Sequence, residues 1–278
     1  MYGELIMFRR LVITNFLHYF QIIASLVFVS FTEFSWWGLL AAYVGLFCFG
    51  CLGVEINSHR YFSHKSFEYK YKWMRYVFSW FNCLSGTGSP MQWVATHHAH
   101  HKHSDKEGDP HNPREKGLMM FLFLSYPEVN KMSVKHMVKD KYQVWIHNNI
   151  LLVYLITWAV LYLLGGLWLV VWAGMIPSVL VALVQIMTTY LCHMDFGYTN
   201  YKTEDKSKNV WWWALFDFGE ALHNNHHANT KRWYLSDKWW EVDISGLVIK
   251  YFLKNKKDPA LVNEIFDEDF TEFGYEKR

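Results

Sequence analysis

Four apolar segments of membrane-spanning length restrict what this chain can fold into more than any other feature. They comprise residues 11–31, 36–56, 150–172 and 175–193 of the 278-residue sequence. Each has about the 20 residues that a helix needs to cross the core of a bilayer. Residues 32–35 join the first two segments, and a Gly-Met-Ile-Pro turn at residues 174–177 joins the last two. The sequence therefore predicts an all-α membrane protein with four transmembrane helices in two hairpins.

The positive charges predict how these helices are oriented. Two arginines precede the first helix, the other Lys and Arg residues follow the second and the fourth, and neither hairpin tip carries one. Because cytoplasmic loops are enriched in Lys and Arg, we expect a cytoplasmic helical cap formed by residues 57–147 and 195–253. A solvated tail, residues 254–278, follows the cap. Residues 1–278 are expected to form a single integral membrane domain.

The composition supports a membrane location and argues against one class of partner. Tryptophan occurs 15 times, which is typical of proteins whose amphipathic rings line membrane interfaces. A net charge of +2 is too small to favour nucleic acid as a partner. Two shorter apolar runs, residues 73–84 and 117–126, fit either amphipathic helices on the membrane surface or core helices of the cap.

Nine of the fifteen histidines lie just outside the apolar segments, on the predicted cytoplasmic side. They are His59, His64, His97, His100, His101, His193, His223, His226 and His227. Two of their clusters share the spacing H-x-x-H-H, which places three imidazoles on one helical face. Imidazole binds iron, zinc and copper, and nine imidazoles exceed the four ligands of a tetrahedral zinc. The set therefore predicts two metal ions with four or five nitrogens each.

The first cluster imposes a geometric condition on this prediction. His59 and His64 are five positions apart, which is about 140° around an ideal α-helix. They can share a face only where the helix ends or bulges, and binding to two different metal ions would also accommodate them.

Carboxylates close to the histidines in the sequence are expected to orient them. Ferritin-like di-iron proteins repeat Glu-x-x-His on two helices, whereas this chain has the motif once, at Glu220 and His223. Glu220 is therefore predicted to hold a ligand histidine through its second ring nitrogen. Asp105, Asp109 and Asp195 are further candidates for the same role.

In their sequence context, the three clusters resemble the three histidine boxes of the membrane fatty-acyl desaturases. The matching stretches are HRYFSHKSF, WVATHHAHHKHSDKEGDPHNP and GEALHNNHHA, and the flanking words GSPMQW, HMDFGY and KSKNVWW also match. The resemblance is greatest to the stearoyl-CoA, Δ9-type group, which includes bacterial members, and covers roughly residues 36–245. It implies a fatty acid desaturase of lipid metabolism, with four transmembrane helices under a cytoplasmic cap.

The resemblance also implies cofactors and partners. The nine histidines would hold two iron ions that cycle between Fe2+ and Fe3+, and a kinked apolar tunnel would hold the substrate. The reaction would use O2 to insert a cis double bond into a saturated acyl chain, carried as acyl-CoA or on another acyl carrier. A separate donor, either a b-type cytochrome, a ferredoxin or a rubredoxin, would supply electrons. The short segment before the first helix favours the bacterial inner membrane over the endoplasmic reticulum.

One position departs from the family pattern. Family members often have an Asn four residues before the lone histidine, where it contacts a metal through water, and this chain has Thr189 there. A threonine hydroxyl can hold a water, but it has a shorter reach and fewer donors than an amide.

Two other functions fit some of these features. A membrane hydroxylase of alkanes, sterols or acyl chains would use the same metal chemistry and yield an alcohol in place of a double bond. A histidine-rich metal transporter or storage protein would need polar ligands near the bilayer midplane, whereas these histidines lie at helix ends and in the predicted cap.

Overall fold

The computed structural model describes residues 16, 19–117, 119 and 133–255. Every regular element within these residues is helical, and β-structure is limited to isolated bridges. The labelled elements are α2 (Trp36–Leu46), η1 (Phe47–Ser63), α3 (Met74–Cys83), α4 (Pro90–His103), α5 (Pro113–Lys116), α7 (Lys141–Asn148), α8 (Ile150–Leu169), η2 (Val170–Met175), α9 (Ile176–His193), α10 (His223–Ala228), α11 (Ile244–Val248) and η3 (Ile249–Leu253). The predicted all-α class is therefore confirmed for the described part of the chain.

Two continuous helical stretches are long and apolar enough to cross a membrane. One joins α2 to η1 over Trp36–Ser63, and the other joins α8, η2 and α9 over Ile150–His193. A shorter apolar helix, Tyr19–Val29, belongs to the first predicted segment. Residues 11–15, 17 and 18 of that segment lie outside the described residues.

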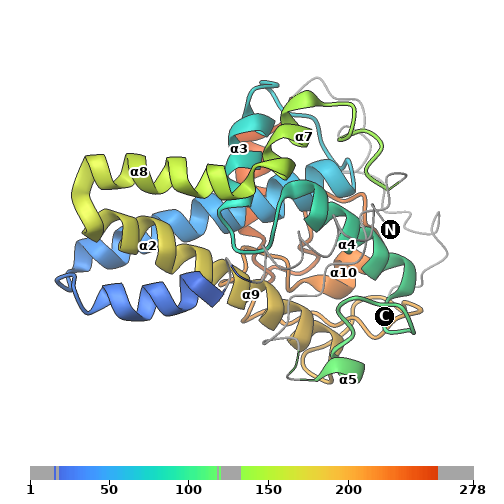
Figure 1. Ribbon diagram of the computed structural model, residues 1–278. Coiled ribbons are helices and arrows are strands. Elements are labelled where there is room, and N and C mark those ends of the chain that lie inside the picture. The colour runs from blue at the N-terminus through green and yellow to red at the C-terminus, as the bar shows by residue number, and fades with distance from the viewer. Residues whose placement is uncertain (1–15, 17–18, 118, 120–132, 256–278) are drawn as a thin grey trace.

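The turn of the second hairpin lies earlier in the chain than the sequence suggested. Gly165 and Gly166 interrupt the helix, and Gly166 adopts φ 63° and ψ −160°, a combination that essentially only glycine tolerates. Figure 1 shows α8 running away from the cap and the chain returning through α9. The predicted turn at residues 174–177 is wrong. Pro177 stands at the start of α9, directly after the π-helical η2, where its missing N–H is tolerated.

Small residues bring α2 close to the helical segment that returns from the turn of this hairpin, which consists of η2 and α9. A Cβ atom on Gly38 would lie 2.7 Å from the ring of Trp172, and one on Gly45 would lie 2.5 Å from Pro177. Ala42, between them, is buried. Close approach through small residues is the usual way in which helices pack in a lipid environment.

The cap lies at the end of the long helices opposite the turn between α8 and α9 (Figure 1). The predicted apolar run at residues 73–84 forms α3, and Phe78 and Cys83 of this helix are buried. A Cβ atom on Gly53 of η1 would lie 2.6 Å from the backbone nitrogen of Asn82, so the two helices touch backbone to backbone. One face of this run therefore packs against η1, whereas Trp73 and Val77 are exposed. The other run, residues 117–126, lies outside the described residues except for residues 117 and 119.

Candidate metal centre

The structure brings the nine predicted histidines together in two groups. The five-nitrogen group contains His59, His64, His97, His101 and His226, and the four-nitrogen group contains His100, His193, His223 and His227. Within each group, the candidate ligand atoms all lie within 4.8 Å of one another. Side chains from η1, α4, α9 and α10 thus meet at the junction of the long helices and the cap.

Each H-x-x-H-H cluster is divided between the two groups. Helix α4 contributes His97 and His101 to the five-nitrogen group and His100 to the four-nitrogen group. Helix α10 contributes His226 to the first group and His223 and His227 to the second. A single helical turn therefore supplies histidines to both groups, which the spacing alone did not indicate.

A π-helix explains how His59 and His64 reach the same group. The backbone N–H of His64 donates to the carbonyl of His59 at 3.2 Å, which is the i→i+5 pattern of a π-helix. Residues five apart then lie on nearly the same face, and the two ring centroids are 4.9 Å apart. Of the alternatives that the sequence left open, the structure shows a departure from α-helical geometry, in the form of the π-helix η1. Single π-helical turns are frequent at functional sites.

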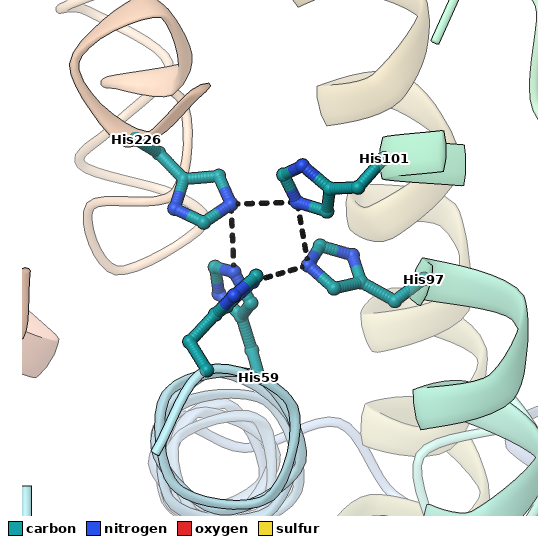
Figure 2. A group of neighbouring side chains, drawn as sticks. His59, His97, His101 and His226 are labelled. Atoms are coloured by element: carbon teal, nitrogen blue, oxygen red, sulfur yellow. Dashed lines mark hydrogen bonds between the residues drawn. The ribbon is translucent and has the colours of Figure 1, made fainter. Parts of the chain in front are cut away.

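The Nε2 atoms of the five-nitrogen group point toward one another, as Figure 2 shows for His59, His97, His101 and His226. The Nε2–Nε2 distances are 3.1 Å from His59 to His226, 3.0 Å from His226 to His101 and 2.9 Å from His101 to His97. Ligand nitrogens at about 2.1 Å from a metal ion and at right angles to one another are separated by about 3 Å. The spacing therefore fits a set of metal ligands.

Each histidine of the four-nitrogen group has a carboxylate at its other ring nitrogen. The Nδ1–O distances are 2.9 Å for His100 and Asp109, 3.0 Å for His193 and Asp105, 3.2 Å for His223 and Glu220, and 2.5 Å for His227 and Asp205. A proton held on Nδ1 by a carboxylate leaves the Nε2 lone pair free for a metal. In agreement, Nε2 of His100 is buried without a hydrogen-bond partner.

Glu220 connects the two groups. One of its carboxylate oxygens lies 3.2 Å from Nδ1 of His223, and the other lies 2.8 Å from Nδ1 of His59. Glu55 also approaches Nδ1 of His59, at 3.5 Å. Glu220 thus contacts a histidine of each group, whereas the sequence had suggested one partner for it.

Burial favours the neutral form of three of the clustered histidines, His97, His223 and His226. It lowers the pKa of His97 and of His226 well below the ordinary value, and it lowers the pKa of His223 to about 3. Burial alone would raise the pKa of Asp109, but the hydrogen bond from His100 lowers it to about 2. Neutral imidazoles beside ionised carboxylates are the forms that a metal cation requires.

Two of the predicted supporting residues contact other groups. The hydroxyl of Thr189 donates to the backbone carbonyl of Gln185 at 3.1 Å. The carboxylate of Asp195 pairs with Arg114 at 2.9 Å and is 83% exposed. Asp105 occupies the position beside His193.

Two carboxylates of the centre were missed in the sequence. Glu55 lies one turn before His59 on the same helix, and this i,i+4 spacing could have identified it. Asp205 lies in a loop, 22 positions before its partner His227. No local pattern links Asp205 to that histidine, because only the fold brings them together.

Buried amides hold α10 in place. Asn225, between His223 and His226, accepts hydrogen bonds from the side-chain amides of Asn200 at 2.9 Å and Asn209 at 2.7 Å. Its own amide donates to Glu241 at 3.0 Å. The short helix is thereby fixed by its polar side as well as by its histidines.

The comparisons with known proteins agree with this geometry. The fatty acid desaturase family profile matches residues 34–244. The chain is 33% identical to Delta-9 acyl-lipid desaturase 2 of Arabidopsis thaliana, over 82% of this chain and 76% of the relative. It is 32% identical to the sn-1 stearoyl-lipid 9-desaturase of Synechocystis, over 83% and 73%. It is also 30% identical to a palmitoyl-monogalactosyldiacylglycerol delta-7 desaturase of Arabidopsis thaliana, over 79% and 60%.

Proposed function

This chain belongs to the fatty acid desaturase family and is an oxidoreductase of its Δ9 type, and from this premise we propose that its two histidine groups each hold one iron ion. When bound, the iron pair supplies the oxidising power that, with O2 and two electrons, removes two hydrogens from adjacent methylenes. The products are a cis double bond and two waters, once two protons have been taken up.

One observation carries this proposal. Nine imidazoles converge in two groups, and each member of the four-nitrogen group has its Nδ1 atom beside a carboxylate. This arrangement points the Nε2 lone pairs inward, and uncompensated lone pairs at such short distances repel one another. A cation in each group relieves that repulsion, and iron adds the redox activity that zinc lacks.

The residues of the chain position and shield the reaction. The indole of Trp93 stacks on His97, with ring centroids 4.7 Å apart and an interplanar angle of 19°. His59, His193 and His226 are buried, so the surrounding structure limits access of water. Because the acyl chain has no polar group near its reacting carbons, its position depends on the shape of the surrounding protein, and a small misplacement is costly.

We further propose that the chain is one domain that crosses the membrane four times, with the cap on the cytoplasmic side. The turn at Gly165 and Gly166 divides Ile150–His193 into two passes. The predicted segment at residues 11–31 and the helix Trp36–Ser63 supply the other two. The Lys and Arg residues gather on the side of the histidines. The Synechocystis relative is compatible with a bacterial inner membrane.

The acyl carrier is proposed to be a glycerolipid. The sequence resemblance suggested acyl-CoA, but the relatives described above are named as acyl-lipid or lipid-bound acyl desaturases. A separate one-electron donor, either a b-type cytochrome, a ferredoxin or a rubredoxin, would complete the reaction.

Expression in a host that lacks desaturases tests the function. We expect mass spectrometry of the host lipids to show a new cis-monounsaturated acyl chain, absent from a His226→Ala control. Membranes supplied with saturated glycerolipid or saturated acyl-CoA would then distinguish the two carriers. An alcohol product would instead indicate a hydroxylase, and no oxidised product together with metal flux would indicate a transporter.

A further inference from the structure

The two histidine groups differ in the number of carboxylates behind them. All four members of the four-nitrogen group have a carboxylate within 3.2 Å of Nδ1. Among the described residues, His59 is the one member of the five-nitrogen group with a carboxylate at ion-pair distance. The carboxylate that lies nearer to it, Glu220, is shared with the other group.

The two groups also differ in burial. All four histidines of the four-nitrogen group are buried, whereas His64 and His101 of the five-nitrogen group are only partly buried. At the level of whole residues, the five-nitrogen group is therefore the less enclosed of the two. This difference is independent of the carboxylates and points in the same direction.

Both features act on the affinity for a cation. A carboxylate that accepts the Nδ1 proton fixes the imidazole and makes Nε2 a stronger donor, and removing one such partner typically weakens metal binding by about 10–100-fold. The nearby negative charge also attracts a divalent ion directly. The five-nitrogen group has one more ligand. Apart from the shared Glu220, however, the four-nitrogen group has three carboxylates and the five-nitrogen group has only Glu55, at 3.5 Å, and we expect this difference to outweigh the extra ligand.

We propose that the two ion positions are unequal, so that the four-nitrogen group retains its metal while the five-nitrogen group exchanges metal with solution. This inference rests on the proposed two-metal function and adds the order in which the two ions are lost. Asp105, Asp109 and Asp205 are then positioning residues for the retained ion. Each acts through one histidine, at 3.0, 2.9 and 2.5 Å respectively.

Chelator titration of the full chain in detergent tests the order. The protein is loaded with Co2+ alone, without O2 or substrate, and bound cobalt is measured by mass spectrometry and by its visible absorption. We expect two phases of loss, with midpoints separated by at least about tenfold in chelator. The species left between them should hold one cobalt ion per chain.

Variants assign the phases. Asp205→Asn and Asp109→Asn should each move the second phase toward the first by about 10–100-fold, with the first phase unchanged. Glu204→Gln is the matched control, because its exposed carboxylate lies in the same loop and makes only a 3.9 Å contact with Lys106. It should move neither phase.

The outcomes separate this inference from the proposed function. Simultaneous loss of both ions, or an effect of Asp205→Asn confined to the first phase, would overturn the order of loss alone. If the aspartate variants fail to fold, loss of both ions from the wild-type chain in a single phase still overturns it. A wild-type chain that binds fewer than two ions would contradict the proposed function itself.

Discussion

Arg60 and Asp243 form a buried ion pair with two hydrogen bonds, of 2.8 and 2.9 Å, across 183 positions of the sequence. Their side chains are 1% and 0% exposed. Arg60 also donates to the carbonyl of Trp233 at 2.8 Å, and Asp243 accepts from the backbone N–H of Leu235 at 2.7 Å. Since Arg60 follows His59 directly, this pair ties the first histidine cluster to the segment after α10.

Arg60→Ala should destabilise the protein by about 3–5 kcal/mol, because it leaves the buried charge of Asp243 without a partner. Denaturant titration of the purified protein in detergent measures this change in the free energy of unfolding. Lys106→Ala is the control, because Lys106 and Glu204 form an exposed pair at 3.9 Å that should contribute at most about 1 kcal/mol. Equal effects of the two substitutions would show that the buried pair has no special role.

Glu220→Gln should lower metal affinity in both groups, by about 10–100-fold, because Glu220 lies beside both His59 and His223. The amide keeps the size of the side chain but lacks the negative charge. Metal binding is measured by competition with a chelator, using Glu115→Gln as a control at an exposed position. Weaker binding of only one of the two ions would contradict the role of Glu220 as a link between the groups.

Gly166→Ala should destabilise the hairpin by about 1–3 kcal/mol, because Gly166 has a positive φ of 63° that a side chain disfavours. Gly174→Ala should cost less. Gly174 lies within the helical segment η2, and its Cβ atom would meet the flexible end of Leu161 at 3.1 Å. Thermal unfolding of the two variants compares them. The reverse ranking would place the turn at residues 174–177, where the sequence suggested it.

The stability of the metal-free protein should fall as the pH drops below about 6.5. Burial lowers the pKa of His97 and of His226 well below that of an exposed imidazole, so the unfolded chain takes up protons that the folded chain rejects. Each such group contributes up to about 1.4 kcal/mol per pH unit below the unfolded pKa. Denaturant unfolding between pH 7.5 and 5.5 measures this slope. His226→Gln should reduce it, and an unchanged slope would argue against burial as the cause.

The sequence identified the chemical groups of the centre better than their arrangement. The spacing of the histidines selected eight of the nine residues that converge, because ligands on short helical turns leave a local pattern, and His193 was selected by its place at the end of an apolar segment. Their division into two groups depends on the angle at which α4 and α10 meet, which no local pattern encodes. Asp205 depends on tertiary structure for the same reason.

For the membrane helices too, the sequence located the segments better than the turn between them. Hydropathy located both long stretches, but it could not distinguish the Gly165–Gly166 turn from the Gly-Met-Ile-Pro segment. A pair of glycines and a proline can each interrupt a helix. In the structure, the π-helical η2 places Pro177 at a helix start, where the residue does not break the helix.

The iron content of the purified chain tests the proposed centre most directly. Wild-type protein reconstituted with Fe2+ should bind two ions, one for each histidine group. His223→Ala and His97→Ala should each reduce this number, and His103→Ala, a histidine of α4 outside both groups, should leave it unchanged. If the wild-type chain held no iron, or if all three variants retained the wild-type content, the nine histidines would not be the metal ligands.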